Sequence, residues 1–560
     1  MSPTPPNLSN TCPTCGSLTK TTFSVHSRSS RISELLGCND PPSDNELSDF
    51  QNFVKSGPGR IADLDEKIAR ANEHLATLID ERRILEANIE DARTLSSPIR
   101  RVPSDILRGI AFEAIPSPYD VLNPINTLKD SANSLDSRES PWTLAQVSHR
   151  WRLTIVNAPE MWSSMSLVIK HHETPSTVAR QMFMTGLRLE RSKFFPLTVS
   201  LSNSSNADIS NHPLLLLIST CSSSIRNLRV QTSLISYLSW WRGRLDRLRH
   251  ITLISSTAHT SSSQSSGGAE GVVDAFEFAP KLQAVTLRPL VSGDRFDLAV
   301  RLPKTQILHL DFEIIDWKDI GMLRHFRNLD CLRVRYSRKL LLVPADHEIV
   351  SLPVLASLTL TYIYKPDSRF SGRPGSDPIF SLLSVPNLAY LRLVYSREFV
   401  ILPTILAPNA ITALRIELDT LCNTMPFPPK GFSALLGSVP NLRDLVITPS
   451  SISPFVYDAS LLILLLIEIP LYHLRSLDLR GSTLEGPMSL GNLCMNKFVE
   501  MVEAHRPGIS EEKAQMETVY LHCPLTLDPI YAQRWKTLID GGLKVVYGRP
   551  ELMAMNMNCL

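Results

Sequence analysis

The most regular feature of this chain is a short apolar pattern that recurs beyond residue 220. Each copy has an apolar residue, two variable residues, an apolar residue, one variable residue and a third apolar residue, often after Pro-Asn or Pro-Lys. The clear copies are Ile225/Leu228/Val230, Leu248/Ile251/Leu253, Leu282/Val285/Leu287, Leu329/Leu332/Val334, Leu355/Leu358/Leu360, Leu388/Leu391/Leu393, Ile411/Leu414/Ile416, Leu442/Leu445/Ile447 and Leu474/Leu477/Leu479. Weaker copies end on Leu308/Leu310 and Val519/Leu521.

The last two apolar residues of each copy predict one short strand, because alternate side chains of a strand point to the same face. A single unit cannot bury its own apolar face, so successive units are expected to stack and to join their strands into one parallel sheet. The expected fold class is therefore α/β, with an irregular repeat solenoid over residues 166–525. A helix beginning at Pro529 and a strand ending at Tyr547 are expected to form a C-terminal cap over residues 526–560.

A second period predicts a long helix over residues 61–96. Apolar residues recur there with alternating spacings of three and four, at Ile61, Leu64, Ile68, Ala71, Leu75, Leu78, Leu85, Ile89 and Ala92. These are the a and d positions of a heptad repeat, and Arg82 is the polar residue among them. The seam predicts either a coiled coil that forms a homodimer through residues 61–95 or a single helix that packs back on its own chain. The helix is expected to end before Pro98.

The segments on either side of this helix differ from it in composition. Residues 1–60 are rich in Ser, Thr, Pro and Asn without an apolar period, so they are expected to be a disordered tail. Residues 98–165 are expected to form a small helical module, whose first helix Ser104 caps. The stretch from Pro116 to Pro141 predicts a loop insertion within this module. The apolar positions of its two helices are Ile106, Leu107, Ile110 and Phe112, then Leu144, Val147, Trp151 and Ile155.

Composition limits the class of protein. A chain of 560 residues that is 43% hydrophobic and 20% charged predicts several folded domains or a repeat array. The formal net charge of +2 gives no general attraction to nucleic acid or anionic lipid. Nine unevenly placed cysteines favour an intracellular location, cytoplasmic or nuclear. No apolar run approaches the roughly 20 residues of a membrane span, and no secretory signal is recognised, so no membrane contact is expected.

No motif in the sequence predicts catalysis. Cys12-Pro-Thr-Cys15 has the spacing of half a zinc site, but a structural site needs four ligands, and His26 and Cys38 are irregularly spaced. The chain has no phosphate-binding glycine loop, no Gly-x-Ser-x-Gly and no His-Glu-x-x-His motif. We therefore expect a binding protein that is not an enzyme and has no metal or cofactor.

Arginines are frequent among the variable residues of the repeats, which are expected on the exposed face of the strands. The acids among these residues are Asp311, Glu417 and Asp478. The arginines are Arg229, Arg288, Arg333, Arg335, Arg392, Arg415 and Arg480. Guanidinium groups pair with carboxylates and phosphates, which predicts capture of an acidic or phosphorylated protein segment. The alternative is a set of ordinary solvated positions with local ion pairs. Nucleic acid is not expected, because no aromatic stacking platform accompanies the arginines.

The repeats resemble leucine-rich repeats over roughly residues 220–525. The resemblance departs from the standard repeat at the position three residues past the last leucine, where Asn or Cys is usual. This chain has serine there at Ser233, Ser256, Ser337, Ser396, Ser450 and Ser482. A serine hydroxyl bonds a turning backbone more weakly than an asparagine amide, so the repeats are expected to be irregular.

Residues 98–165 resemble an F-box of the kind that fungal proteins join to leucine-rich repeats. The matching residues are Val102-Pro103-Ser104-Asp105-Ile106-Leu107, Leu144-Ala145-Gln146-Val147-Ser148-His149-Arg150-Trp151-Arg152 and Ala158-Pro159-Glu160-Met161-Trp162. The resemblance implies that the module binds a Skp-type adaptor of a cullin ubiquitin ligase. The residues that it implies for this contact are Pro103, Ile106, Leu107, Val147 and Trp151.

Under this hypothesis the repeat face binds the protein substrate, and the expected substrate-binding residues are Arg333, Arg335, Arg392 and Arg415. Two alternatives stay open at this point. The chain could be a scaffold that dimerises through its coiled coil without any link to a ligase. The helices of the module could also do no more than cover the N-terminal edge of the repeats.

Overall fold

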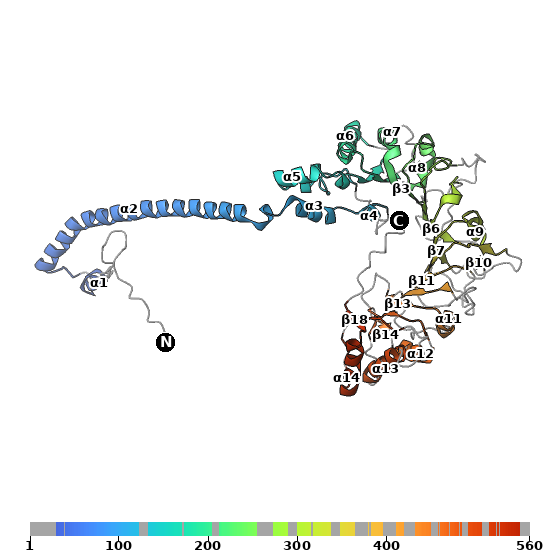
Figure 1. Cartoon of the computed structure of the whole chain (residues 1–560). Helices are drawn as coiled ribbons and strands as arrows, with labels where there is room; N and C mark the ends of the chain where they lie inside the picture. Colours follow the sequence, from blue (N-terminus) through green and yellow to red (C-terminus); the bar gives the residue numbers. More distant parts are fainter. Residues whose placement is uncertain are drawn as a thin grey trace. The chain divides into compact units, whose positions relative to one another are not determined.

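The computed structural model describes two compact units, Met1–Val102 and Pro103–Leu560. The first contains a long helix, and the second is a mixed α/β unit with a large parallel sheet (Figure 1). The structure describes the chain apart from residues 1–29, 39, 123–132, 171–172, 204–211, 255–272, 289–299, 315–316, 338–347, 364–378, 380–381, 396–409, 419–431, 450–456, 459, 470, 481, 484–490, 507–514, 522–523, 526 and 549–560.

The first unit has a short helix, α1 (Ser30–Gly37), and the long helix α2 (Asp44–Ser96) of 53 residues. A capping box starts α2: the Ser43 hydroxyl accepts a bond from the Glu46 N–H, and the Glu46 carboxylate accepts one from the Ser43 N–H. The helix therefore begins well before Ile61, and part of the segment expected to be disordered is helical. The predicted end before Pro98 is confirmed, since α2 stops at Ser96.

No residue of α2 is buried among the residues that the structure describes. Within the described part of the first unit, therefore, no other segment covers the apolar seam of α2. Pro58 lies inside α2, where its ring lacks the N–H that would bond to the carbonyl of Val54. Figure 1 shows that α2 bends in its N-terminal part, as expected for a helix that contains proline.

The second unit contains a 14-stranded sheet whose strands follow one another in chain order. Every neighbouring pair is parallel. The strands are β1 (Ser164–Ile169), β2 (Leu197–Asn203), β3 (Ile225–Gln231), β4 (His250–Ile254), β5 (Ala284–Arg288), β6 (His309–Ile314), β7 (Cys331–Ser337), β9 (Ser357–Ile363), β11 (Tyr390–Tyr395), β12 (Ala413–Leu418), β13 (Asp444–Pro449), β15 (Ser476–Asp478), β17 (Thr518–Leu521) and β18 (Lys544–Tyr547). Two small separate sheets pair β8 (Val350–Ser351) with β10 (Leu383–Ser384) and β14 (Tyr457–Asp458) with β16 (Ser482–Thr483).

The strands predicted from the repeating pattern are confirmed, and the sheet extends beyond them at both ends. Strands β1 and β2 precede residue 220 and were not expected. At the other end, the predicted helix is α14 (Pro529–Asp540), and the predicted last strand is β18. Strand β18 pairs with β17, so it continues the same sheet at its last edge.

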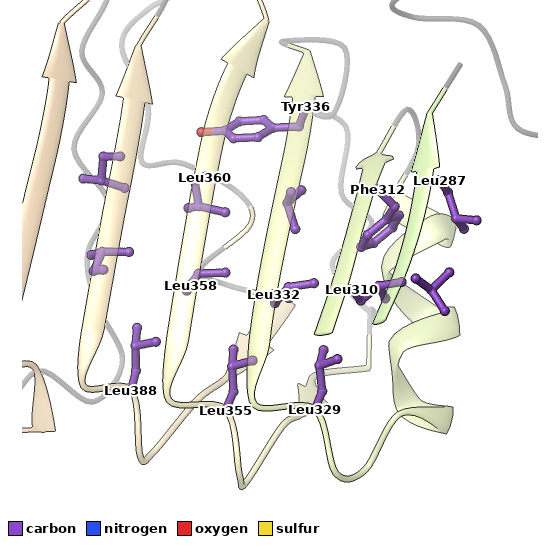
Figure 2. Packing of buried hydrophobic residues seen from close by; sticks show 14 of the residues in the cluster. Leu287, Leu310, Phe312, Leu329, Leu332, Tyr336, Leu355, Leu358, Leu360 and Leu388 are labelled. Carbon is purple, nitrogen blue, oxygen red and sulfur yellow. The ribbon is translucent and has the colours of Figure 1, made fainter. Parts of the chain in front are cut away.

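The sheet holds its apolar residues in straight rows across the strands. One row takes one residue from every strand: Met165, Val199, Leu228, Ile251, Val285, Leu310, Leu332, Leu358, Leu391, Leu414, Leu445, Leu477, Val519 and Val545. Figure 2 shows Leu310, Leu332 and Leu358 side by side in this row. It also shows Leu329, Leu355 and Leu388, the first leucines of their units, turned into the same core below the strands.

Strand β6 corrects the predicted register of one repeat. The pattern had Leu308 in the middle position and Leu310 at the end, but Leu310 pairs with Val285 and Leu332 in the middle row. Phe312 then takes the last apolar position and is buried. The shift by two residues also places Glu313 on the strand, where it pairs in register with Arg335.

Helices that connect the strands line one face of the sheet. They are α6 (Pro175–Ser192), α7 (Pro213–Ser219), α8 (Thr232–Ile235), α9 (Trp317–Gly321), α11 (Phe432–Ser438), α12 (Ser460–Glu468), α13 (Gly491–Ala504) and α14, with short 3-10 turns η4 (Ser222–Ser224), η5 (Ser236–Trp241), η7 (Lys304–Gln306) and η8 (Met322–His325). Their side chains Ile218, Leu435 and Phe498 join the apolar rows in one continuous core. In the part of the chain described, no helix combines the length and apolar character that a membrane crossing requires.

Candidate binding surfaces on the helical module and the sheet

The helical module has a small core of its own. It contains η1 (Pro98–Arg100), α3 (Ser104–Glu113), η2 (Leu144–Gln146), α5 (His149–Val156) and η3 (Pro159–Met161), and α3 packs against α5. The Ser148 hydroxyl caps α5 by accepting a bond from the Trp151 N–H. The expected cap at Ser104 is wrong, because Pro103 takes the N-cap position and α3 has no side-chain cap. The core side chains are Leu107, Ala111, Trp151, Ile155, Met161 and Trp162.

The residues expected to contact an adaptor separate into two groups. Leu107 and Trp151 are 0% and 8% exposed and fill the core of the module, so they cannot form a contact surface. Pro103 is exposed, and the side chains of Ile106 and Val147 are 52% and 61% exposed. In this structure Leu107 and Trp151 thus serve the core of the module, because the apolar stripe of a short helix contains both its buried and its exposed residues.

An exposed residue that the prediction missed lies one turn beyond Ile106. Ile110 is about half exposed and shares a face of α3 with Ile106, since residues four apart are neighbours on a helix. We call Pro103, Ile106, Ile110 and Val147 the module surface. Single exposed apolar residues are common, and these four are candidates for a contact surface.

Arg188 of α6 joins the module to the first edge of the sheet. Its guanidinium is almost fully buried and donates to the carbonyl oxygens of Ser134 (2.8 Å) and Ser164 (2.6 Å). It also lies 5.9 Å from the ring centre of Trp162. Burial lowers the pKa of Arg188 to about 10, so it stays charged at neutral pH. Arg188 thus contacts two residues of the module, Ser134 and Trp162, and one residue of strand β1, Ser164.

The predicted loop insertion contains structure that covers part of the sheet. Helix α4 (Pro118–Leu122) contacts β1, β2 and β3, and its Val121 and Leu122 are buried outside the main core. The sheet face opposite the apolar rows is buried over these strands, as Ser200 shows. We infer that α4 covers this face at the first three strands. Residues 123–132 lie outside the described part of the chain.

A row of mainly polar residues crosses the face opposite the apolar core. From β3 to β15 it contains Arg229, Thr252, Thr286, Asp311, Arg333, Thr359, Arg392, Arg415, Val446 and Asp478. Arg229 lies in the covered part, where it donates to the Ser200 hydroxyl at 2.8 Å and burial lowers its pKa to about 10. The substrate residues predicted from the sequence lie farther along, on β7, β11 and β12.

Acidic side chains on this face each hold a pair of arginines. The carboxylate of Asp311 accepts from Arg335 at 2.8 Å and from Arg288 at 3.4 Å. The carboxylate of Glu417 accepts from Arg392 and Arg415, each at 2.7 Å. Both acids are mostly buried, which strengthens these pairs. One acid between two arginines leaves each group of three with a net positive charge of one.

These pairs bear on the two interpretations of the arginines. Arg335, Arg392 and Arg415 form local ion pairs, which is the alternative to a set of arginines waiting for an acidic partner. Arg333 lies in the polar row, half buried, between Asp311 and Thr359. The acids neutralise part of the positive charge of these arginines. The groups around Asp311 and Glu417 each keep a net positive charge of one.

A buried histidine lies on the same face of β4, two residues before Thr252 of the polar row. His250 contacts the hydroxyls of Thr286 (3.2 Å) and Thr252 (3.4 Å). Burial lowers the pKa of His250 to about 4; nearby Asp311 opposes this effect, whereas Arg288, Arg333 and His309 add to it. The histidine is therefore neutral in the folded protein at neutral pH.

We expect this histidine to make folding stability depend on pH. Below the usual histidine pKa of about 6.5 the unfolded chain binds a proton that the folded chain does not bind until about pH 4. The midpoint of urea unfolding should therefore fall as pH drops from 6.5 to 4. His250→Gln, which keeps a polar side chain but cannot titrate, should show a shallower fall; an identical pH profile would contradict this assignment.

Metal binding finds no support in the residues that the structure describes, which contain no group of three or more potential ligands. Cys12, Cys15 and His26 lie outside them, so the half zinc site stays a prediction. Comparison of the chain with protein-family models gave no match, and a search of curated proteins found no relative. Functional inference for this chain therefore depends on its own residues and their geometry.

Proposed function

We propose that this chain is the substrate receptor of a Skp-cullin-F-box type ubiquitin ligase, with its repeats arranged as a leucine-rich-repeat solenoid. The module surface would bind the Skp-type adaptor, and the polar face of the sheet would bind the protein substrate. The observation that carries the proposal is a small helical module with an exposed apolar surface, followed by parallel strands in chain order. The resemblance in sequence supplies the name of the partner.

The arrangement of the repeats supports the solenoid. Each unit contributes one strand and one residue to each apolar row, which is how leucine-rich repeats stack. Asn328 and Asn387, each just before a first leucine, donate to the backbone carbonyls of Thr305 and Pro353 in the preceding units. These side chains tie consecutive units together at equivalent positions.

The polar face supports a preference for acidic or phosphorylated protein segments. The groups around Asp311 and Glu417 keep a net positive charge of one each. A ligand phosphate or carboxylate can share the N–H donors of Arg335 or Arg392 without displacing the acid, since a guanidinium has five donors. In this proposal the chain contributes no catalytic group, and it acts by holding a substrate close to the ligase's catalytic partner.

Capture of the adaptor tests the proposal. We expect purified Skp-type adaptor to bind the full chain, and Ile106→Asp combined with Ile110→Asp to reduce capture at least a hundredfold, because charged groups cannot enter an apolar contact. Phe183→Asp, which changes an exposed aromatic on α6, should bind like the unmodified chain. Thermal unfolding of the variants checks that the core residue Leu107 is undisturbed. Failure of the unmodified chain to bind would overturn the proposal.

A second candidate function is a scaffold that dimerises through α2 without a ligase. The observation that favours it is the seam of exposed apolar residues on α2, none of which is buried. The two functions differ in the adaptor experiment, since a scaffold does not need the module surface. They also do not exclude one another, because the seam and the module surface lie in different units.

A further inference from the structure

The start of α2 at Asp44 lengthens the heptad seam. Counting back from Ile61 in heptads, Leu47 and Val54 take a positions, and Phe50 and Gly57 take d positions. The seam thus extends from Leu47 to Ala92, about seven heptads. Its large apolar residues other than Phe50, which is partly exposed, are all exposed: Leu47, Val54, Ile61, Leu64, Ile68, Leu75, Leu78, Leu85 and Ile89.

We propose that α2 pairs with α2 of a second copy of this chain in antiparallel orientation, with Ile68 opposite Ala71 of the second copy. This register overlaps the two helices along nearly their whole length, because the midpoint of α2 lies between these residues. The pairing does not depend on the proposed ligase function. Three features of the seam distinguish it from a parallel pair.

The first feature is Arg82, the charged residue at an a position. In a parallel pair Arg82 faces Arg82 of the second copy, and two guanidinium groups meet inside the seam. In the antiparallel register Arg82 faces Gly57 of the second copy, which has no side chain and leaves room for the arginine. A Cβ atom added to Gly57 would have no neighbouring atom within 4 Å, so the space beside this residue is open. The longest polar side chain of the seam thus meets its smallest residue.

The second feature is the backbone beside Gly57. Pro58 has no N–H, so the carbonyl of Val54 lacks its usual helical hydrogen bond. The guanidinium of Arg82 bonds Glu86 through Nε at 2.9 Å and has further N–H donors in the same fork. In the antiparallel register these donors lie beside the corresponding turn of the second copy's α2. Arg82 can therefore donate to the Val54 carbonyl of that copy.

The third feature is the charge at the positions that flank the seam. In the antiparallel register Arg60 meets Glu81 of the second copy, and Asp44 meets Arg93. By symmetry each pair occurs twice, which gives four attractive contacts. In a parallel pair Arg60 meets Asp65, but Glu81 meets Glu86 and the two repel. Opposite charges across the flanking positions set orientation in coiled coils, so the sequence favours the antiparallel pair.

Mass and cross-linking of the full chain test orientation. Light scattering should give twice the chain mass of 62.6 kDa. Leu47 lies opposite Ala92 in the proposed register, so oxidation of Leu47→Cys mixed with Ala92→Cys should give a covalent dimer. The unmodified chain and either variant alone, which keep the native cysteines, should not form that product. A covalent dimer from Leu47→Cys alone would show a parallel pair, and a monomeric chain at tens of micromolar would also overturn the proposal.

Charge reversal gives an independent test with opposite signs for the two orientations. In the antiparallel pair Glu81→Arg places two arginines together, at positions 81 and 60, and should raise the dimer Kd about tenfold. In a parallel pair the same change removes the repulsion from Glu86 and lowers the Kd. Adding Arg60→Glu should restore the original Kd. Glu73→Arg, on the opposite side of the helix from the seam, should leave it unchanged. Adaptor capture tests the proposed ligase function, and the dimer Kd tests the pairing of α2. Because the two measurements are separate, one proposal can fail without the other.

Discussion

Leu358→Ala should lower the free energy of unfolding by about 3 kcal/mol, in the range found when a fully buried leucine is truncated. Leu358 is 0% exposed and lies in the middle row between Leu332 and Leu391. Its removal leaves a cavity that three neighbouring units share. Because the backbone ladder fixes the spacing of the strands, the rows cannot close around that cavity.

Urea unfolding followed by circular dichroism measures this change as a shift in the midpoint. Val354→Ala is a matched control, since Val354 loses two methyl groups from an exposed position four residues earlier. The control should change the free energy of unfolding by no more than about 0.5 kcal/mol. Equal effects at the two positions would contradict the continuous core on which the solenoid depends.

Arg188→Met should also destabilise the chain, by about 3 kcal/mol, although methionine has a similar length and is apolar. The guanidinium donates to the carbonyls of Ser134 and Ser164; in the variant the buried Ser164 carbonyl loses this donor, and the Ser134 carbonyl keeps the indole N–H of Trp142. Removing a charge from a buried site gives back part of the desolvation cost, which limits the loss. Arg188→Lys should lie between the two proteins, because an ammonium group keeps the charge but not the planar fork.

Thermal unfolding of these variants distinguishes a hydrogen-bonding role from simple filling of space. Arg180→Met changes an exposed arginine on the same helix and should unfold with the unmodified chain. If Arg188→Met is as stable as the unmodified chain, the side chain does no more than occupy volume. In that case the link between the module and α6 must lie in other contacts, such as that of the Arg191 guanidinium with the ring of Trp162, 4.4 Å from its centre.

The repeats could be predicted from the sequence because the spacing of their leucines is also what places them in the core. Leu355, Leu358 and Leu360 match a spacing, and that same spacing places all three in one core. The prediction failed at β6, where Leu308 and Leu310 offer a second match two residues before the observed unit of Ile307, Leu310 and Phe312. Strands β1 and β2 were missed because serine and threonine fill their polar face under α4, and no first leucine marks their start.

The start of α2 and the details of the surfaces were harder to predict. Gly57, Pro58 and Gly59 suggest a loop, and the capping box at Ser43 and Glu46 outweighs them. The pairing of Arg392 with Glu417 joins residues 25 positions apart, and it depends on the register of β11 and β12. Burial of Leu107 beside the exposed Ile106 depends on how α3 meets α5. Such facts follow from packing between elements, which a periodic pattern does not contain.

The order of the strands has a consequence for how the second unit comes apart. Each strand of the large sheet bonds only to the strands on either side of it, and these are its neighbours in the chain. Cutting the chain after β13 would therefore take a partner in the large sheet from β13 alone, and every earlier strand of that sheet would keep its own partners. Unfolding can begin by fraying at β18 and proceed unit by unit, as in a zipper opened from its end.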